Sequence, residues 1–170
     1  MQPVSAVKIE DGGLHLGMSS AQVNDRVNTA KNIVNYAIGM NNHMGSAATA
    51  DPQLMTYLMT ALQEKHLFFL DSRTIGKSVA GKIAKERGVH SLDRHIFLDD
   101  SNELADVQHQ FQAAIQYARK HGTAIAIGHP RPNTIAGLQA GLNNLPADIQ
   151  LVGMGNLWRN EKVIPPKPFI

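Results

Sequence analysis

Histidine, aspartate and arginine side chains follow four short apolar segments of this sequence, and such groups can bind a metal or transfer protons. In chain order they are His43, Asp71, Arg73, Asp99, Asp100 and His129. Imidazole and carboxylate groups are ligands for divalent ions such as zinc, and they also act as general acids and bases. The sequence therefore predicts a site for hydrolytic chemistry, provided that the fold brings these side chains together.

The aspartates also have structural interpretations. Asp99 and Asp100 precede a predicted helix, and a carboxylate at that place is a common helix cap. Asp71 and Arg73 lie two residues apart and could form an ion pair under a loop. Both interpretations stay open at the level of the sequence.

The two histidines are harder to interpret as packed core residues. His43 lies in the polar loop 41–46, directly after an apolar segment, and His129 stands between a glycine and a proline. Loops on a rigid scaffold are where binding groups concentrate. We therefore regard both as candidates for a functional site.

Apolar segments alternate with amphipathic segments along the chain, which is typical of strands and helices in turn. The predicted strands are 36–40, 67–70, 96–98, 123–128 and 149–154, and the predicted helices are 19–34, 51–65, 78–87, 102–120 and 133–142. This alternation, with no hairpin signals, requires a parallel sheet with helical crossovers. The predicted fold class is α/β. In such folds ligands bind beyond the carboxyl ends of the strands, where the polar residues above would meet.

Outside this β/α region we expect little regular structure. Residues 1–18 are predicted to be irregular, with a short strand near 4–9, and residues 161–170 form a Pro-rich tail that should be extended. The single domain predicted between them covers residues 19–160.

Composition excludes several other functions. The chain has no cysteine, so disulfides, thiolate ligands and a cysteine nucleophile are excluded. No apolar run is long enough to insert into a membrane, and the first residues are not typical of a signal peptide. The net charge is +2 with scattered basic residues, so we predict no nucleic-acid partner. Neither a phosphate-binding P-loop nor a Gly-x-Ser-x-Gly elbow occurs.

Four motifs in the same order resemble the divergent polysaccharide deacetylases, a branch of the NodB-like carbohydrate deacetylases. They are Asn-Asn-His-Met-Gly-Ser (41–46), Phe-Leu-Asp-Ser-Arg-Thr (69–74), Arg94 with Phe-Leu-Asp-Asp (97–100), and Ala-Ile-Gly-His-Pro (126–130). The resemblance covers residues 19–158. It implies a partial or distorted β/α barrel and a metal-activated water that hydrolyses N-acetyl or O-acetyl groups of a glycan such as peptidoglycan.

The resemblance also implies roles for individual residues. His43, Asp71 and His129 would be ligands of a divalent metal, with zinc the expected ion. Asp71, Arg73 and His129 would take part in catalysis, with Arg73 stabilising the oxyanion. The residues expected to bind substrate are Asn42, Arg94, Asp99 and Asp100.

Three departures from the family pattern qualify this expectation. Ala47 stands where the superfamily has the second histidine of a His-x-x-x-His pair, and His95 follows Arg94 where the family has aspartate. The family's opening strand with its double aspartate has only a superficial counterpart at Ile9-Glu10-Asp11. The chain thus resembles the C-terminal part of the family domain. The missing units would leave two open sheet edges, which a homodimer or strand exchange would cover.

The sequence leaves three functions open. The first is a metal-dependent deacetylase, and the second is a non-catalytic module that binds glycan or another part of the cell envelope. The third is a module that binds a small anionic ligand through Arg73 and helix N-termini. The resemblance implies a periplasmic or cell-envelope location.

Overall fold

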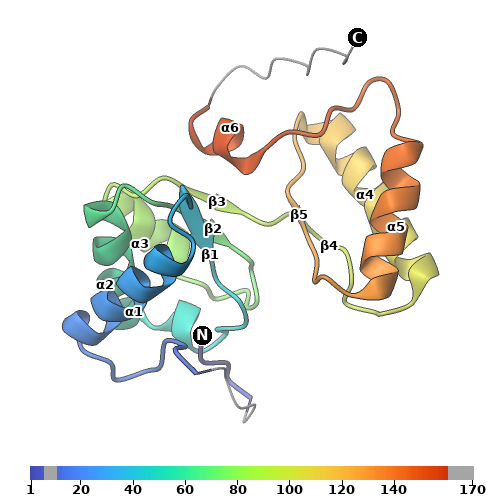
Figure 1. Ribbon diagram of the computed structural model, residues 1–170. Coiled ribbons are helices and arrows are strands. Elements are labelled where there is room, and N and C mark those ends of the chain that lie inside the picture. Colours follow the sequence, from blue (N-terminus) through green and yellow to red (C-terminus); the bar gives the residue numbers. More distant parts are fainter. Residues whose placement is uncertain (6–10, 161–170) are drawn as a thin grey trace. The chain divides into compact units, whose positions relative to one another are not determined.

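The computed structural model describes residues 1–5 and 11–160, which form a mixed α/β structure (Figure 1). The chain divides into two compact units, Met1–Asp93 (unit 1) and Arg94–Ile170 (unit 2). Unit 1 contains α1 (Ser20–Ile33), β1 (Gly39–Asn41), η1 (Ala48–Ala50), α2 (Pro52–Glu64), β2 (Phe68–Asp71), α3 (Ala80–Glu86) and β3 (Ser91–Asp93). Unit 2 contains β4 (Ile96–Phe97), α4 (Leu104–His121), β5 (Ala126–Ile127), α5 (Pro132–Asn143) and α6 (Met154–Trp158).

The strands of unit 1 form a parallel sheet with β2 in the centre, in the order β1-β2-β3. Met40 pairs with Phe69, and Phe69 pairs with Ser91 on the other side. Parallel pairing places the carboxyl ends of the strands at one edge. The loop after β1, which carries His43, therefore begins next to Asp71 at the end of β2 and to the loop that carries Arg73.

Side chains cap two helices of unit 1 at the positions that the sequence predicted. Ser19 begins α1 with a capping box, in which its side chain and that of Gln22 each accept a backbone N–H. Asp51 caps α2 by accepting the N–H of Leu54, with Pro52 at the first helical position. These contacts satisfy N–H groups that otherwise lack partners at a helix start.

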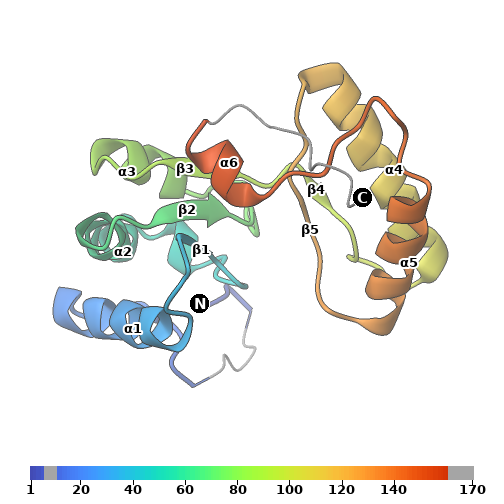
Figure 2. The ribbon, with the colours of Figure 1, turned by 45° about the horizontal axis from the view of Figure 1, so that its top comes forward.

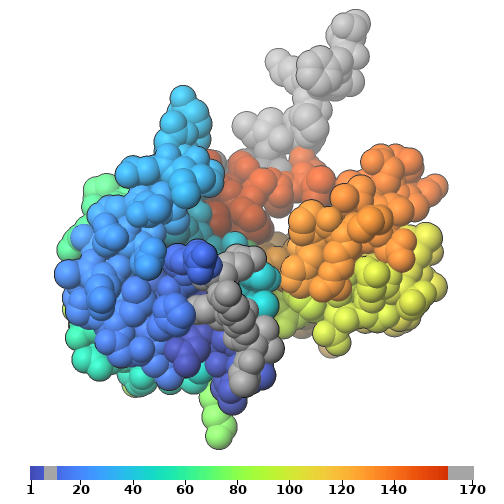
Figure 3. Space-filling view, turned by 60° about the horizontal axis from the view of Figure 1, so that its bottom comes forward, coloured from blue at the N-terminus to red at the C-terminus, as the bar shows by residue number. Residues whose placement is uncertain are grey.

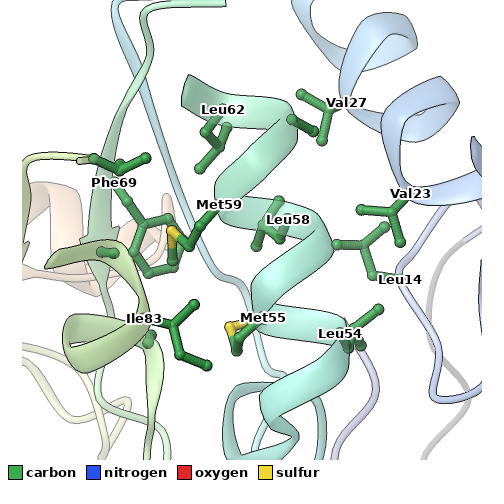
Figure 4. Close-up of a cluster of buried hydrophobic side chains, with 14 of the residues drawn as sticks. Leu14, Val23, Val27, Leu54, Met55, Leu58, Met59, Leu62, Phe69 and Ile83 are labelled. Atoms are coloured by element: carbon green, nitrogen blue, oxygen red, sulfur yellow. The ribbon is translucent and has the colours of Figure 1, made fainter. Parts of the chain in front are cut away.

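Helix α2 lies between α1 and α3 (Figure 2). It contributes six of the sixteen buried residues in the core of unit 1. Its buried side chains point in two directions (Figure 4). Leu58 lies towards Val23 of α1, whereas Met59 lies towards Phe69 of β2. Leu54, Leu58, Met59 and Leu62 recur at helical spacing within the predicted helix 51–65, and all four are buried.

In unit 2 the strands β4 and β5 form a second parallel sheet. His95, directly before β4, is hydrogen-bonded to Ile125, directly before β5. The N–H of Ile125 donates to the His95 Nδ1 atom over 2.9 Å, and the N–H of His95 donates to the Ile125 carbonyl over 2.8 Å. The His95 ring also stacks on Tyr117 of α4, with 4.7 Å between ring centroids. At the position where the family has aspartate, this chain therefore uses an imidazole as a backbone acceptor.

Helices α4 and α5 lie against each other (Figure 3). They pack closely because α5 presents two glycines to α4. A Cβ atom at Gly137 would lie 2.6 Å from Val107 Cγ1. One at Gly141 would lie 2.6 Å from two ring carbons of Phe111. Real Cβ atoms do not approach neighbours so closely, so the small residues set the distance between these helices.

We expect Gly141→Ala to lower the free energy of unfolding of unit 2 by about 1–3 kcal/mol, because the added methyl overpacks a filled interface. The matched control is Gly81→Ala in α3, where an added Cβ would meet nothing within 4 Å. That substitution should stabilise its helix by about 0.5–1 kcal/mol. Amide hydrogen exchange in α4 and α3 measures the two effects, and equal effects would contradict the proposed packing.

Several strand predictions were wrong. The strand at 36–40 instead begins at Gly39, and Tyr36 is 91% exposed rather than buried. Residues 149–153 form no strand, and α6 begins at Met154. Strand β3 was missed, because the three residues Ser-Leu-Asp are too few to show a strand pattern and become a strand through pairing with β2. Parallel pairing is confirmed, but among the described residues it forms two sheets instead of one.

The remaining predictions for the chain ends fall partly outside the described residues. The strand near 4–9, most of the motif Ile9-Glu10-Asp11 and the tail 161–170 lie there. Within residues 1–5 and 11–160, no helix has the length and apolar character needed to cross a membrane.

Candidate functional site

Asn42 joins the loops that follow β1 and β2 in unit 1. Its side chain is 1% exposed, and its Oδ1 atom accepts the N–H of Ser72 over 2.7 Å. Its Nδ2 group donates to the Met44 carbonyl over 3.2 Å, and its own carbonyl accepts from Ser72 Oγ over 2.6 Å. Asn42, which was predicted to bind substrate, therefore holds the two loops together through hydrogen bonds from a buried position.

Asp71 at the end of β2 holds the following loop in shape. The carboxylate is 1% exposed; Oδ1 accepts the N–H of Arg73 over 2.8 Å and Oδ2 accepts from Ser78 Oγ over 2.6 Å. Both oxygens of this buried group therefore have partners, as burial of a charge requires. The hydroxyl of Ser78, just before α3, was not among the predicted site residues.

The loops after β1 and β2 each contain a non-glycine residue in the left-handed region, with φ 55° at Met44 and 52° at Arg73. Such residues are uncommon and cluster at functional sites. The Arg73 guanidinium lies 3.2 Å from Asp93 Oδ2 and forms an ion pair with this residue of β3. The side chain of His43 is exposed, and its carbonyl accepts from the amino terminus of Met1 over 2.9 Å.

In unit 2 Asp99 and His129 form a hydrogen-bonded pair. The His129 Nδ1 atom lies 3.0 Å from Asp99 Oδ1, and the His129 N–H donates to Asp99 Oδ2 over 2.7 Å. Oδ2 also accepts from Thr134 Oγ1 over 2.7 Å. Asp99 is 0% exposed, and Glu103 is the N-cap residue of α4, so the interpretation of Asp99 as a helix cap was wrong.

The surroundings of Asp99 keep it ionised. Burial alone would raise the pKa of its carboxyl group, but hydrogen bonds from Thr134 and from the amide and ring of His129 outweigh burial and lower that pKa. An ionised carboxylate can only accept hydrogen bonds. Nδ1 of His129 must therefore carry a proton, which places the lone pair of the neutral imidazole on Nε2.

The loop before α5 is fitted closely around this pair. Arg131 Nη1 donates to the Asp99 carbonyl over 2.8 Å. A Cβ atom at Gly128 would lie 3.1 Å from Thr134 Cγ2 and 3.3 Å from Leu98 Cβ, so a larger residue would push on the strand or on α5. Neither Arg131 nor Thr134 was predicted. The only sequence signal was their place around the start of the helix that follows His129.

Aromatic contacts connect the Asp99–His129 pair with Arg94, which was predicted to bind substrate. The rings of Phe97 and His129 meet edge to face, with 5.6 Å between centroids. The Arg94 guanidinium carbon lies 5.1 Å from the Phe97 ring centroid, within the range of a cation–π contact. Asp100, by contrast, is exposed.

A cavity of about 1090 Å³ within unit 2 reaches the pair. His129 and Thr134 are among its lining residues, and much of the remaining lining is aliphatic, including Leu98, Ile115 and Leu138. Cavities lined by apolar groups with a few polar groups are typical of ligand sites. His129 therefore borders a space that a ligand can enter.

The predicted site residues fall into two sets, and neither set assembles a metal centre by itself. His43, Asp71 and Arg73 belong to unit 1, whereas Asp99, Asp100 and His129 belong to unit 2. In the described parts of the chain, no three His, Asp or Glu side chains are grouped so that they could hold a metal ion. Within unit 1, each Asp71 oxygen accepts one hydrogen bond from the loop that follows β2.

Comparison with known proteins agrees with the fold and the motifs. The chain is 92% identical over its full length to an uncharacterized protein of Haemophilus influenzae Rd, and 44% identical over 98% of its length to the uncharacterized protein YibQ of Escherichia coli K12. It spans 61% and 53% of the lengths of these relatives.

A solved structure has the same fold. The uncharacterized protein ATU2773 of Agrobacterium tumefaciens C58 superposes with a TM-score of 0.86 at 22% identity, over 92% of this chain and 65% of that one. The family described as divergent polysaccharide deacetylase matches residues 1–158, which include all four motifs. With parallel β/α architecture and polar residues at the strand ends, this chain belongs to the divergent polysaccharide deacetylase family.

Proposed function

We propose that the chain hydrolyses acetyl groups from a polysaccharide, and its family supports such a deacetylase-like function. The observation that carries the proposal is the pair of His129 and buried Asp99 beside a cavity. A histidine oriented by a carboxylate through Nδ1 is suited to proton transfer through Nε2.

In this proposal His129 moves one proton in each direction. Nε2 accepts a proton from water while the water oxygen bonds to the acetyl carbonyl carbon. It then donates that proton to the departing nitrogen or oxygen of the sugar while the bond to the carbonyl carbon breaks. The products are acetate and a free amine or hydroxyl. Asp99 stays ionised and stabilises the imidazolium that exists between the two transfers.

The test is acetate release from N-acetylated and O-acetylated oligosaccharides by the 170-residue chain. We expect His129→Gln to lower the rate by about 10²–10⁴-fold, the usual contribution of a general acid or base. His109→Gln on the exposed side of α4 is the matched control and should leave the rate unchanged. If both variants release acetate at the original rate, His129 does not have this role.

The predicted zinc site calls for a separate measurement. Elemental analysis of the purified chain should be made beside His43→Ala, with His15→Ala as a control at another exposed histidine. Stoichiometric zinc that is lost only with His43 would support the metal ligand that the family resemblance implies. Absence of zinc in every sample, even after incubation with the ion, would exclude metal-dependent hydrolysis by this chain.

A non-catalytic glycan-binding module is the second candidate. It is favoured over a metal-dependent hydrolase by the lack of a grouped metal-binding set within the described residues. Binding of an acetylated oligosaccharide without acetate release, unchanged by a chelator, would support it over the hydrolase.

Two further properties are proposed from the family resemblance and from the sheet edges. We propose a periplasmic or cell-envelope location for the whole protein. We also propose that open strand edges lead to a homodimer, since β4 and β5 form a sheet of only two strands. Sedimentation at increasing concentration tests the dimer.

A further inference from the structure

We propose that Thr134 is a positioning residue that fixes the Asp99 carboxylate and, through it, the tautomer of His129. The inference rests on the proposed function, because that function assigns proton transfer to His129. Thr134 lies in the first turn of α5, is 1% exposed, and donates from Oγ1 to Asp99 Oδ2 over 2.7 Å.

The hydroxyl of Thr134 limits the rotation of the carboxylate. The terminal torsion of an aspartate has a broad energy profile, so its plane must be held by contacts. Oδ2 receives two donors, the hydroxyl of Thr134 and the N–H of His129. With Oδ2 held, Oδ1 is directed at His129 Nδ1 over 3.0 Å. Without the hydroxyl, the His129 N–H is the remaining donor of these two to Oδ2. That N–H belongs to the same loop as the imidazole that the carboxylate has to orient.

The methyl group of Thr134 has a different contact. A Cβ atom at Gly128 would lie 3.1 Å from Thr134 Cγ2, so the methyl packs beside the backbone that leads into His129. The hydroxyl of Thr134 therefore contacts the Asp99 carboxylate, and its methyl group contacts the loop that leads to His129. Thr134→Val retains the shape and removes the hydroxyl, whereas Thr134→Ser retains the hydroxyl and removes the methyl.

Nitrogen NMR of the imidazole groups, at a pH well above the ordinary histidine pKa, gives a readout that does not need activity. The His129 signals are identified by their loss in His129→Gln. We expect the proton to reside on Nδ1 in the original chain and in Thr134→Ser. In Thr134→Val we expect a mixture with the Nε2-protonated form, which is the favoured form of an unconstrained imidazole.

Kinetics then separate this inference from the proposed function. If acetate is released, Thr134→Val should lower kcat by about 10- to 100-fold with KM unchanged, as for loss of a hydrogen bond to a charged group, and Thr134→Ser should retain the rate. If no acetate is released but the tautomer changes as described, the proposed function fails and the positioning role stands. A tautomer that is unchanged in Thr134→Val, or lost in Thr134→Ser, overturns the positioning role whatever the activity.

Discussion

Asp99→Asn should abolish acetate release while leaving unit 2 folded. The amide oxygen of asparagine can take the place of Oδ2 and accept from Thr134 Oγ1 and from the N–H of His129, both over 2.7 Å in the original chain. The amide NH₂ group then faces His129 Nδ1, where Oδ1 was 3.0 Å away. Since NH₂ can only donate, Nδ1 must accept, and the proton of the neutral imidazole moves to Nε2.

This exchange of tautomers removes the lone pair that proton transfer requires. In a serine protease the corresponding change leaves the geometry intact and lowers kcat by about 10⁴-fold, and we expect a loss of about 10³–10⁴-fold here. Acetate release measures the rate, and imidazole NMR measures the tautomer. Asp106→Asn is the matched control, because Asp106 is exposed in the first turn of α4 and is not among the predicted site residues. Full activity in Asp99→Asn with the proton on Nε2 would refute the role assigned to His129.

Asp71→Ala should strongly destabilise unit 1, whereas Asp71→Asn should be tolerated. Alanine removes the acceptor of the Arg73 N–H at 2.8 Å and of Ser78 Oγ at 2.6 Å. Both bonds are partly buried, and a buried donor that loses its partner costs about 1–3 kcal/mol. Asparagine keeps one oxygen for the Arg73 N–H, and its NH₂ group can donate to Ser78 Oγ, because a hydroxyl both donates and accepts.

Amide hydrogen exchange in β2 measures the stability of unit 1 in these variants. Asp93→Ala is the control, since it removes a partner of Arg73 in an exposed ion pair at 3.2 Å. Exposed pairs contribute about 0–1 kcal/mol, so the control should change little. The pattern separates two roles for Asp71. If Asp71 holds the loop in shape, only Asp71→Ala should be unstable. If Asp71 is a metal ligand, both variants should lose metal and neither should lose much stability.

The local chemistry of helix starts and turns was predictable from the sequence. Ser19, Asp51-Pro52 and the left-handed Gly122 act within a few residues of their own positions, so their partners are neighbours in the chain. The apolar face of α2 was predictable for the same reason, because helical spacing alone brings its residues together. The weakest predictions concerned strands. Ser91–Asp93 and residues 149–153 depend on whether a neighbouring strand offers backbone partners.

By itself the sequence determined the α/β class, the family and the polar residues at the ends of the strands. Only the tertiary structure decided which of those residues meet. It joined Asp99 to His129 across a separation of 30 residues, and it joined Asp99 to Thr134 across 35. It also showed that Asp71 accepts hydrogen bonds from Ser78 and from the Arg73 amide. The Arg73 guanidinium forms its ion pair with Asp93. The physical reason is that a carboxylate at a strand end can cap, pair or bind. The choice depends on donors that the packing of distant segments brings within 3 Å.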